Sequence, residues 1–513
     1  MNKHWKNVIL VLTLIVGVLA MSMTTQAAGK GKYFASGKLY YHTLSKNTVE
    51  VCATKQTTGI LTIPASVSYK GTKYKVVKIA DYKFGGESVP VSDDTVNGST
   101  PNLNLQGDHT YRYDRVDGKN IPSDVNWLCN SKISKLVLPS TITYIGDGAF
   151  SGCKKLKNVE FAKKYKKLTI GSNAFVGTNM KNVLLPSGTY ELKENALGTT
   201  AIIKFPASVK KIGAGVVNSA TKKVIVDKKN KNFKLKDNML YSYDEKTLIG
   251  VTAKVSSNII LSSKTTRIAE KAFAGSKVET VTLNANISEI SRGAFASCKN
   301  LLTVAGTEKV TKIGYGAFYG CGRLNNIGAL SNLTEIERAA FWETENCPVT
   351  ISAKVTVDDY AFSGAASKTF AKVSVAANDT MYSVVNGLLI KTAGDKKVVI
   401  LQAQDMEKVD VAEGVTDLAV AVGGSKCKEI TLPASLKNQS GKLSIDGGMV
   451  IYKSVAVPTF GYYFDITNVG KNKITVVVPK GTSAVYKFAM DNAVSARDDC
   501  VLFYDDAEIA ITE

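Results

Sequence analysis

Ala-Phe pairs recur at a nearly constant spacing in the middle of this sequence. Four consecutive pieces between Thr266 and Phe362 read RIAEKAFAGSKVETVTL, EISRGAFASCKNLLTV, KIGYGAFYGCGRLNNI and EIERAAFWETENCPVTI. The phenylalanines Phe273, Phe295, Phe318, Phe341 and Phe362 are 22, 23, 23 and 21 residues apart. A period of about 20 to 29 residues is typical of a solenoid, in which each coil buries its apolar face only by stacking on its neighbours.

The residues inside each repeat fit such a coil. In KNLLTV the apolar Leu301 and Val304 sit where a short strand points inward, whereas Thr303 faces solvent. The alanine of each Ala-Phe pair lets the backbone pack closely, and the ring fills the space between coils. We therefore predict a continuous ladder of phenylalanine rings, one ring per coil.

The repeat also resembles a known family. ITYIGDGAFSGCKKLKNVEF from Ile142 and TKIGYGAFYGCGRLNNI from Thr311 follow the pattern I-G-x-x-A-F-x-G-C-x-x-L-x-x-V. This pattern resembles the BspA-type leucine-rich repeats of bacterial surface and secreted proteins, and it covers the chain from Ile133 to Leu436. The resemblance implies a right-handed, curved, β-rich solenoid with a parallel sheet on its concave side, and a role in binding.

The pattern divides the chain into eight regions. We predict a signal peptide at 1–27, an N-terminal β-rich cap at 28–86, a loop insertion at 87–132, leucine-rich repeats at 133–227, a β-hairpin insertion at 228–265, further repeats at 266–364, degenerate repeats with hairpin insertions at 365–452, and a C-terminal β-rich cap at 453–513. The last region includes a short helix from about Ser483. A separate small domain is the alternative for that region.

The first residues have the composition of an export signal. Lys3 and Lys6 are followed by an apolar run of 13 residues from Val8 to Ala20 and by small residues at the cleavage site near Ala27. A span of this length is too short for a stable membrane anchor, which needs about 20 apolar residues. We expect a secreted or surface-associated protein with no transmembrane segment after cleavage.

A second kind of repeat predicts β-hairpins inserted between coils. NFKLKDNMLYSYDEKTLIGV, MYSVVNGLLIKTAGDKKVVIL from Met381 and LSIDGGMVIYKSV from Leu443 share an apolar run, a turn residue and a strand, and KYFASGKLYY near the start is a weaker copy. Asp-Asn, Asn-Gly and Asp-Gly pairs favour the tight turns of two-stranded hairpins.

Composition and chemistry favour binding over catalysis. The net charge is +21, but the lysines are scattered and no nucleic-acid-binding module is present, so we expect a solvated basic surface and no nucleic-acid partner. Weak attraction to anionic wall polymers is the alternative. The chain has three histidines, and the repeats contain none, which disfavours a Ser-His-Asp or histidine-zinc site there. We predict no enzymatic activity, no cofactor and no metal.

The eight cysteines allow two interpretations. Cys153, Cys298 and Cys321 share one position in the repeat, which favours buried free thiols. An exported chain with an even number of cysteines also permits disulfides, and Cys298 and Cys321 would lie on adjacent coils.

The outward side chains of the coil strands are the candidate site. They form a polar face of Thr, Asn and Lys, expected on the concave side: Lys157, Asn158, Glu160, Lys181, Asn182, Lys204, Glu279, Thr280, Thr282, Thr303, Asn325 and Asn326. We predict that this face binds an extracellular protein or glycan, in adhesion to host or neighbouring-cell surfaces. The alternatives are that solenoid strands simply need polar outer residues, that the protein is held on a wall by its charge, and, more remotely, that it is an enzyme acting on surface polysaccharide.

Overall fold

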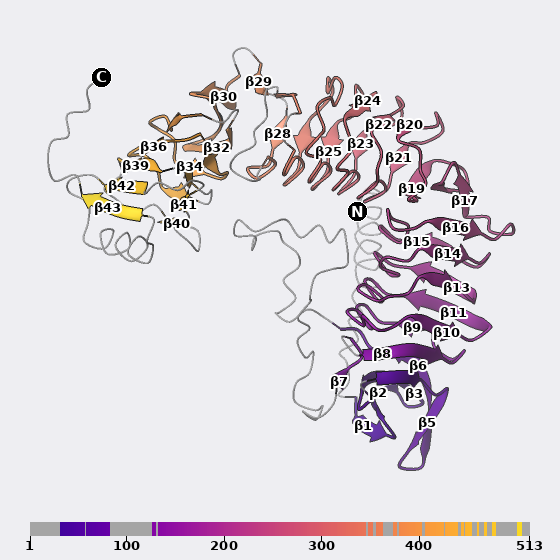
Figure 1. Ribbon diagram of the computed structural model, residues 1–513. Helices are drawn as coiled ribbons and strands as arrows, with labels where there is room; N and C mark the ends of the chain where they lie inside the picture. The colour runs from indigo at the N-terminus through magenta and orange to yellow at the C-terminus, as the bar shows by residue number, and fades with distance from the viewer. Residues whose placement is uncertain are drawn as a thin grey trace, which may run out of the picture.

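The chain folds into a curved β-solenoid (Figure 1), which confirms the predicted fold class. The computed structural model describes residues 31–56, 58–82, 126–129, 132–344, 347–351, 355–362, 373–376, 379–402, 406–424, 426–439, 443–445, 447–453, 459–460, 466–468, 474–478 and 500–504. In these ranges the elements are strands and turns, without an α-helix. The predicted signal peptide, most of the loop insertion and the helix from Ser483 lie outside the described residues. The region boundaries stay predictions.

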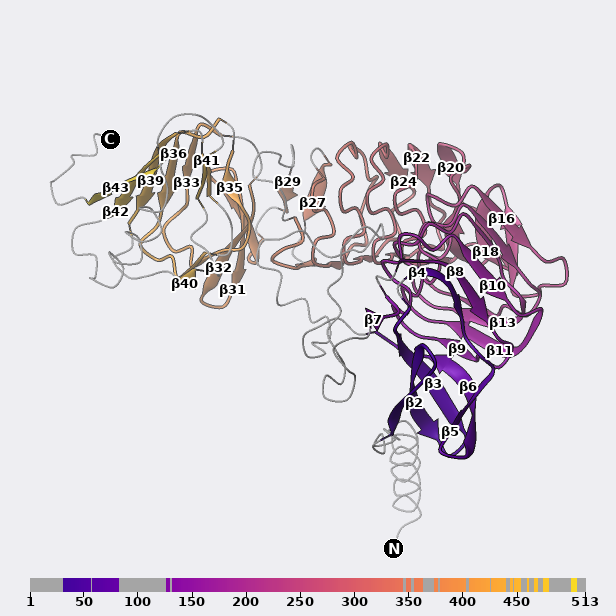
Figure 2. The ribbon, with the colours of Figure 1, turned by 60° about the horizontal axis from the view of Figure 1, so that its bottom comes forward.

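Each coil contributes a strand to a first ribbon, whose strands run in parallel along the coil stack. The strands of this ribbon are β4 (Thr58–Thr62), β8 (Lys132–Leu138), β10 (Asn158–Phe161), β12 (Asn182–Leu184), β14 (Ile202–Phe205), β16 (Lys223–Val226), β20 (Asn258–Ile260), β22 (Thr280–Thr282), β24 (Thr303–Ala305), β27 (Val349–Ile351), β29 (Val373–Val375), β33 (Lys408–Asp410), β36 (Glu429–Leu432), β39 (Gly448–Tyr452), β42 (Ile474–Val478) and β43 (Cys500–Tyr504). Figure 2 shows β20, β22 and β24 side by side along one edge of the stack.

A second parallel ribbon is formed by the strands that precede the Ala-Phe turns. They are β6 (Thr72–Ile79), β9 (Tyr144–Ile145), β11 (Lys164–Ile170), β13 (Ser187–Leu192), β15 (Lys211–Ile212), β21 (Arg267–Ile268), β23 (Glu289–Ile290), β25 (Lys312–Ile313), β26 (Glu335–Ile336), β28 (Thr356–Val357), β34 (Asp417–Leu418), β37 (Asn438–Gln439) and β40 (Thr459–Phe460). Two short strands add to its N-terminal end, β5 (Ser66–Tyr69) against β6 and β7 (Asn126–Trp127) against β3 (Thr48–Thr54).

Three antiparallel meanders interrupt the coils. They consist of β1 (Tyr33–Ser36), β2 (Leu39–Ser45) and β3 (Thr48–Thr54); of β17 (Phe233–Lys236), β18 (Met239–Ser242) and β19 (Thr247–Val251); and of β30 (Tyr382–Val385), β31 (Leu388–Ala393) and β32 (Lys396–Gln402). The third strand of each meander pairs in parallel with the second ribbon. The hairpins predicted at Phe233–Val251 and Met381–Leu401, and the weaker copy near the start, are confirmed.

The hairpin predicted at Leu443–Tyr452 is wrong. β38 (Leu443–Ile445) pairs in parallel with β35 (Val422–Gly423) and β41 (Ile466–Asn468), whereas β39 pairs with β36 and β42. The two strands therefore belong to successive faces of one coil. An Asp-Gly turn between apolar runs occurs in both arrangements, and only stacking against neighbouring coils distinguishes them.

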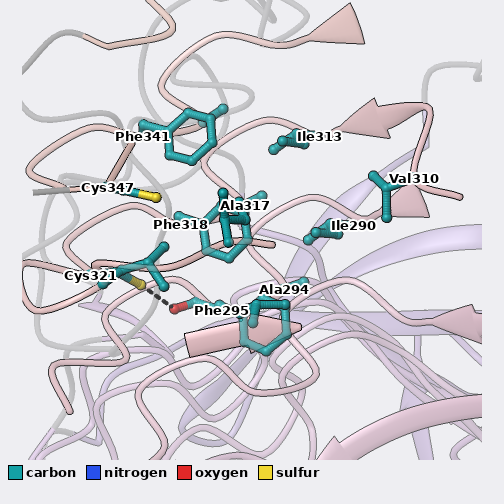
Figure 3. Packing of buried hydrophobic residues seen from close by; sticks show 14 of the residues in the cluster. Ile290, Ala294, Phe295, Val310, Ile313, Ala317, Phe318, Cys321, Phe341 and Cys347 are labelled. Atoms are coloured by element: carbon teal, nitrogen blue, oxygen red, sulfur yellow. Dashed lines mark hydrogen bonds between the residues drawn. The ribbon is translucent and has the colours of Figure 1, made fainter. Parts of the chain in front are cut away.

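The predicted phenylalanine ladder is confirmed. Phe273, Phe295, Phe318, Phe341 and Phe362 stack in sequence, with ring centroids 4.9, 5.4, 5.4 and 5.6 Å apart. The amide of Phe295 donates a hydrogen bond to the carbonyl oxygen of Ala317 in the next coil, and the amide of Phe318 donates to Ala340, both at 2.8 Å. The Ala-Phe pair thus joins successive coils through both its backbone and its ring. Figure 3 shows the rings of Phe295, Phe318 and Phe341 following one another from coil to coil.

The glycine of the Ile-Gly pair allows the coils to approach one another. A Cβ atom on Gly146 would lie 2.2 Å from the carbonyl oxygen of Ala80, and one on Gly314 would lie 2.8 Å from the amide nitrogen of Arg292. Both contacts are with the backbone of the preceding coil, which cannot move aside as a flexible side chain would. Glycine is therefore needed by space at Gly146 and Gly314, whereas other coils hold Ala269 and Ser291 at the equivalent position.

The apolar interior consists of separate cores, and the meanders stand between them. Leu240 packs into the core of the N-terminal coils, while its neighbour Tyr241 packs into the core of the central coils. In the third meander Leu389 belongs to the central core and Ile390 to the C-terminal one. Because successive strand residues point to opposite faces, each of these meanders is a partition with a core on either side.

Candidate functional site

We call the outward face of the first ribbon the strand face. In the three-residue strands β12, β20, β22 and β24 the middle residue is buried, and the residues before and after it point outward, so the stacked strands form two rows of outward side chains. In β12 the central Val183 is buried while Asn182 and Leu184 are exposed, and β20 and β22 have the same alternation. The parallel register aligns these rows from coil to coil, for example Leu184 opposite Lys204. The strands thereby hold outward side chains in fixed positions along the stack.

All twelve predicted site residues lie on or beside the first ribbon. Asn158 and Glu160 are on β10, Asn182 on β12, Lys204 on β14, Thr280 and Thr282 on β22 and Thr303 on β24, while Lys157, Lys181 and Glu279 directly precede strands, and Asn325 and Asn326 follow on the next coil. The three threonines are half-buried and the other nine residues are exposed. They gather on one ribbon, and their role in binding, on a face expected to be concave, stays a prediction.

Several side chains of the strand face bind one another across coils. The hydroxyl of Thr280 donates to Oδ1 of Asn258 at 2.6 Å. Farther along, Ser374 donates to the hydroxyl of Thr350 at 3.1 Å. At the other end Lys135 and Glu160 form an ion pair at 2.6 Å. These contacts rigidify the face, and they show that part of its polarity serves the stacking itself.

Sequence reasoning missed four prominent residues of this face. Leu184 and Ile260 are 63% and 81% exposed although both are large aliphatic side chains. Lys222 and Lys223, at the start of β16, are exposed as well. Aligning the strands NVL, NII and KVIV under one another would have found Leu184, Ile260 and Lys223, because each lies in an outward position of the period-two pattern, whereas Lys222 precedes its strand.

An ion network lies at the N-terminal end of the second ribbon. Glu50 contacts Nδ1 of His42 at 2.9 Å and Nζ of Lys78 at 3.3 Å, and Lys78 also contacts Asp81 at 2.7 Å. Burial acts to raise the pKa of Glu50, but the hydrogen bond from His42 and the charge of Lys78 outweigh burial and lower that pKa. The opposite charges satisfy one another, so this network is structural.

A shallow groove of about 550 Å³ opens beside the first meander. Its lining includes Lys38, Tyr41, Gln56, Ile60 and Pro64. The amide Nε2 of Gln56 donates to the carbonyl oxygen of Thr58 at 2.9 Å and so occupies part of the edge of β4. That contact protects an edge strand from pairing with another chain.

The cysteines of the repeat are buried thiols. Cys153, Cys298 and Cys321 carry thiols that are in no disulfide, and Sγ of Cys298 and of Cys321 each donates to the carbonyl oxygen of the phenylalanine in the preceding coil at 3.0 Å. Burial raises the pKa of Cys298 to about 11, so the thiol stays protonated at neutral pH. In the described part of the chain, no group of three His, Cys, Asp or Glu side chains could hold a metal ion, and no helix there is long and apolar enough to cross a membrane.

Comparison with known families agrees with the coil geometry. Residues 120–244 and 253–369 match the model of the BspA type leucine rich repeat region, in six copies. The chain carries BspA-type leucine-rich repeats. The Ala-Phe ladder and the Ile-Gly contacts described above are thus the structural form of this repeat. A search of curated proteins finds no match.

Solved structures with a similar fold include bacterial leucine-rich-repeat proteins. A leucine rich cell surface protein from Faecalibacterium prausnitzii is 18% identical, with a TM-score of 0.40 over 69% of this chain and 97% of that one. A leucine-rich repeat protein from Eubacterium ventriosum is 16% identical, with a TM-score of 0.39 over 70% and 99%. The pneumococcal vaccine antigen PcpA is 14% identical, with a TM-score of 0.36 over 92% and 99%.

Proposed function

We propose that this BspA-type repeat protein is exported, acts outside the cell without enzymatic activity, and binds a protein or glycan on its strand face. Adhesion to host or neighbouring-cell surfaces is the role that we propose for this binding. The repeats support the proposal because they devote most interior positions to packing and leave the outward rows of the first ribbon free to vary. The export signal predicted at 1–27 supports the location.

The exposure of Leu184 and Ile260 carries the proposal. Each aliphatic side chain follows the buried central residue of its strand, β12 or β20, and is 63% or 81% exposed, and the residue opposite it on the next strand is Lys204 or Thr282. A solenoid coil needs no apolar residue at this position, since Thr282 occupies the row in the coil after Ile260. A large aliphatic side chain that a rigid strand exposes beside polar ones offers a partner an apolar contact point that can be desolvated on binding.

The test is a binding screen of residues 28–513 against arrayed matrix proteins, mucins, wall polymers and glycans at low and high salt. For a ligand found in the screen, we expect the double substitution Leu184→Asn and Ile260→Asn to reduce affinity by about tenfold or more, since hot-spot side chains typically contribute 2 kcal/mol or more. Tyr243→Asn is the matched control, because Tyr243 is 54% exposed on the second meander, away from the ribbon. Equal affinity of the double variant and the parent would refute the strand face as the site.

A further inference from the structure

The groove beside the first meander has a buried floor and a polar rim. Its volume of about 550 Å³ lies within the roughly 300–1,000 Å³ that is usual for small-molecule sites. The turn between β1 and β2, the residue Gln56 after β3, and the strands β4 and β5 surround it. The floor consists of buried side chains of the N-terminal core: Leu39, Tyr41, Leu61 and Val67.

The hydroxyl of Tyr41, in this floor, has no hydrogen-bond partner among the described residues. Tyr41 is 1% exposed, and burial raises its pKa to about 12, so the hydroxyl is neutral at pH 7. Its oxygen is not among the described polar atoms that are sealed from solvent without a partner, so the remaining exposure of Tyr41 includes the hydroxyl. The hydroxyl therefore opens into the groove that Tyr41 lines.

Tyrosines that are equally buried elsewhere in the chain are hydrogen-bonded. The hydroxyl of Tyr165 donates to the carbonyl oxygen of Leu138 at 3.2 Å, and that of Tyr382 donates to the carbonyl oxygen of Val355 at 3.0 Å. A buried polar group without a partner is costly and rare in folded proteins. The hydroxyl of Tyr41 is thus a donor and acceptor that a ligand in the groove can satisfy.

The rim adds further polar groups that are available to a ligand. None of these side chains forms a hydrogen bond or ion pair with a described residue: Ser36, Lys38, Thr62, Ser66 and Ser68. Hydroxyls both donate and accept, so they can meet the hydroxyls of a sugar in either role. Among the described lining residues Lys38 alone carries a charge, so the groove favours a ligand with one negative group.

Gln56 disfavours an extended peptide as the ligand. Its Nε2 donates to the carbonyl oxygen of Thr58 at 2.9 Å and to that of Ile60 at 2.5 Å, so a strand added along this edge of β4 would find both carbonyls occupied. The side-chain oxygen of Gln56 accepts no hydrogen bond from a described residue and stays available.

The apolar part of the rim fits a sugar better than a nucleobase. Ile60 is 55% exposed and Pro64 is half-buried, so both can contact the C–H face of a sugar ring. The described lining has no exposed aromatic ring on which a base could stack.

We propose that this groove binds a short saccharide with one carboxylate, placing a sugar hydroxyl on the hydroxyl of Tyr41 and the carboxylate at Lys38. The site goes beyond the proposed function, because it does not use Leu184 or Ile260, which lie farther along the chain on β12 and β20. The contact with the exposed Lys38 weakens with ionic strength. The buried contact with Tyr41 does not.

The experiment titrates residues 28–513 by calorimetry with an aldobiouronic acid, a disaccharide of one uronic acid and one neutral sugar. Its methyl ester and the acidic tripeptide Ser-Glu-Ser are titrated in parallel. We expect the acid to bind roughly two- to fivefold more tightly than the ester, as for one exposed ion pair. Lys38→Gln should abolish this difference. Tyr41→Phe should weaken binding of the acid by roughly two- to tenfold, the typical contribution of one hydrogen bond.

Tyr165→Phe is the matched control, because it removes a hydroxyl at similar depth that already has a partner in the fold. This variant should keep the parent affinity and lower the midpoint of thermal unfolding. Tyr41→Phe should instead keep the midpoint and lose affinity. The opposite results separate a contact with a ligand from a contact that stabilises the fold.

Three results would each overturn the inference: unchanged affinity in Tyr41→Phe, equal affinity of the parent for the tripeptide or the ester, or no binding of the acid. None of them bears on the proposed function. The double variant at Leu184 and Ile260 tests the strand face separately.

Discussion

The thiol of Cys321 donates a hydrogen bond to the carbonyl oxygen of Phe295, 3.0 Å away in the preceding coil. One coil later Thr344 occupies the same repeat position, and its hydroxyl donates to the carbonyl oxygen of Phe318 at 2.8 Å. The position therefore selects a small side chain with a hydrogen-bond donor. Cysteine meets that need as a thiol, without a partner cysteine.

We predict accordingly that Cys298 and Cys321 remain reduced although they lie on adjacent coils. Each thiol is committed to a backbone carbonyl, and burial raises the pKa of Cys298 to about 11, which suppresses the thiolate needed for disulfide exchange. Alkylation in denaturant without a reductant, followed by peptide mass analysis, should find both residues alkylated. A disulfide-linked peptide that joins them would contradict the assignment.

Phe318 is predicted to be among the most costly single residues to truncate. Its ring is fully buried between Phe295 and Phe341, 5.4 Å from each. Phe318→Ala should lower the free energy of unfolding of the central coils by about 3–5 kcal/mol, because it leaves a cavity in the ladder. Denaturant titration followed by tryptophan or circular-dichroism signals measures this. Tyr243→Ala, at an exposed position, should change stability by less than about 0.5 kcal/mol.

Gly314→Ala should also destabilise the central coils, because the added methyl group has no room and not because contacts are lost. The added methyl group would lie 2.8 Å from the amide nitrogen of Arg292, so the two coils must separate. We expect a loss of about 1–3 kcal/mol, typical of an overpacked interior. Gly394→Asn is the control: Gly394 has φ near +60°, no atom lies within 4 Å of its added Cβ, and asparagine tolerates this conformation. A thermal-unfolding midpoint unchanged in Gly314→Ala would refute the close-approach argument.

Acid should remove the stabilising effect of Glu50. Its pKa is lowered in the folded protein, with burial opposing the shift and His42 and Lys78 producing it, whereas an unfolded glutamate titrates near 4.3. The contribution is therefore present above about pH 4.3 and is lost as the pH falls through the folded pKa. At pH 7 we expect Glu50→Gln to cost about 1–3 kcal/mol.

The check is the difference in unfolding free energy between parent and Glu50→Gln, measured at pH 7 and near pH 3 in the same buffer ions. This difference should shrink at low pH, because the parent then loses the charge that the variant lacks. A difference that is constant with pH would mean that the carboxylate acts by shape alone.

Local patterns were sufficient to predict the coil interior. The spacing of Phe273 to Phe362 and the shared position of Cys298 and Cys321 reflect contacts between equivalent positions of successive coils. Residues that are one repeat apart in the sequence therefore lie next to each other in the structure. The strand face could likewise be predicted, because Thr280 and Thr303 alternate with buried valines.

Long-range pairing could not be predicted. The apolar runs on both sides of the turn after Ile445 read as a hairpin, yet their partners lie in neighbouring coils. Leu184 and Ile260 escaped prediction because an aliphatic residue beside a buried valine or isoleucine reads as interior, and its exposure depends on which face the strand presents. The ligand-binding role of the strand face is not encoded in periodicity at all.

The meanders separate the apolar cores, so local unfolding of the coils can end at a meander. Leu240 and Tyr241, or Leu389 and Ile390, place their side chains in different cores, so the coils on the two sides of a meander pack mainly into separate cores. Loss of structure that begins at the C-terminal coils can thus stop at β30–β32 before it reaches the central ladder. The chain can therefore lose order at one end and still hold its remaining coils in register.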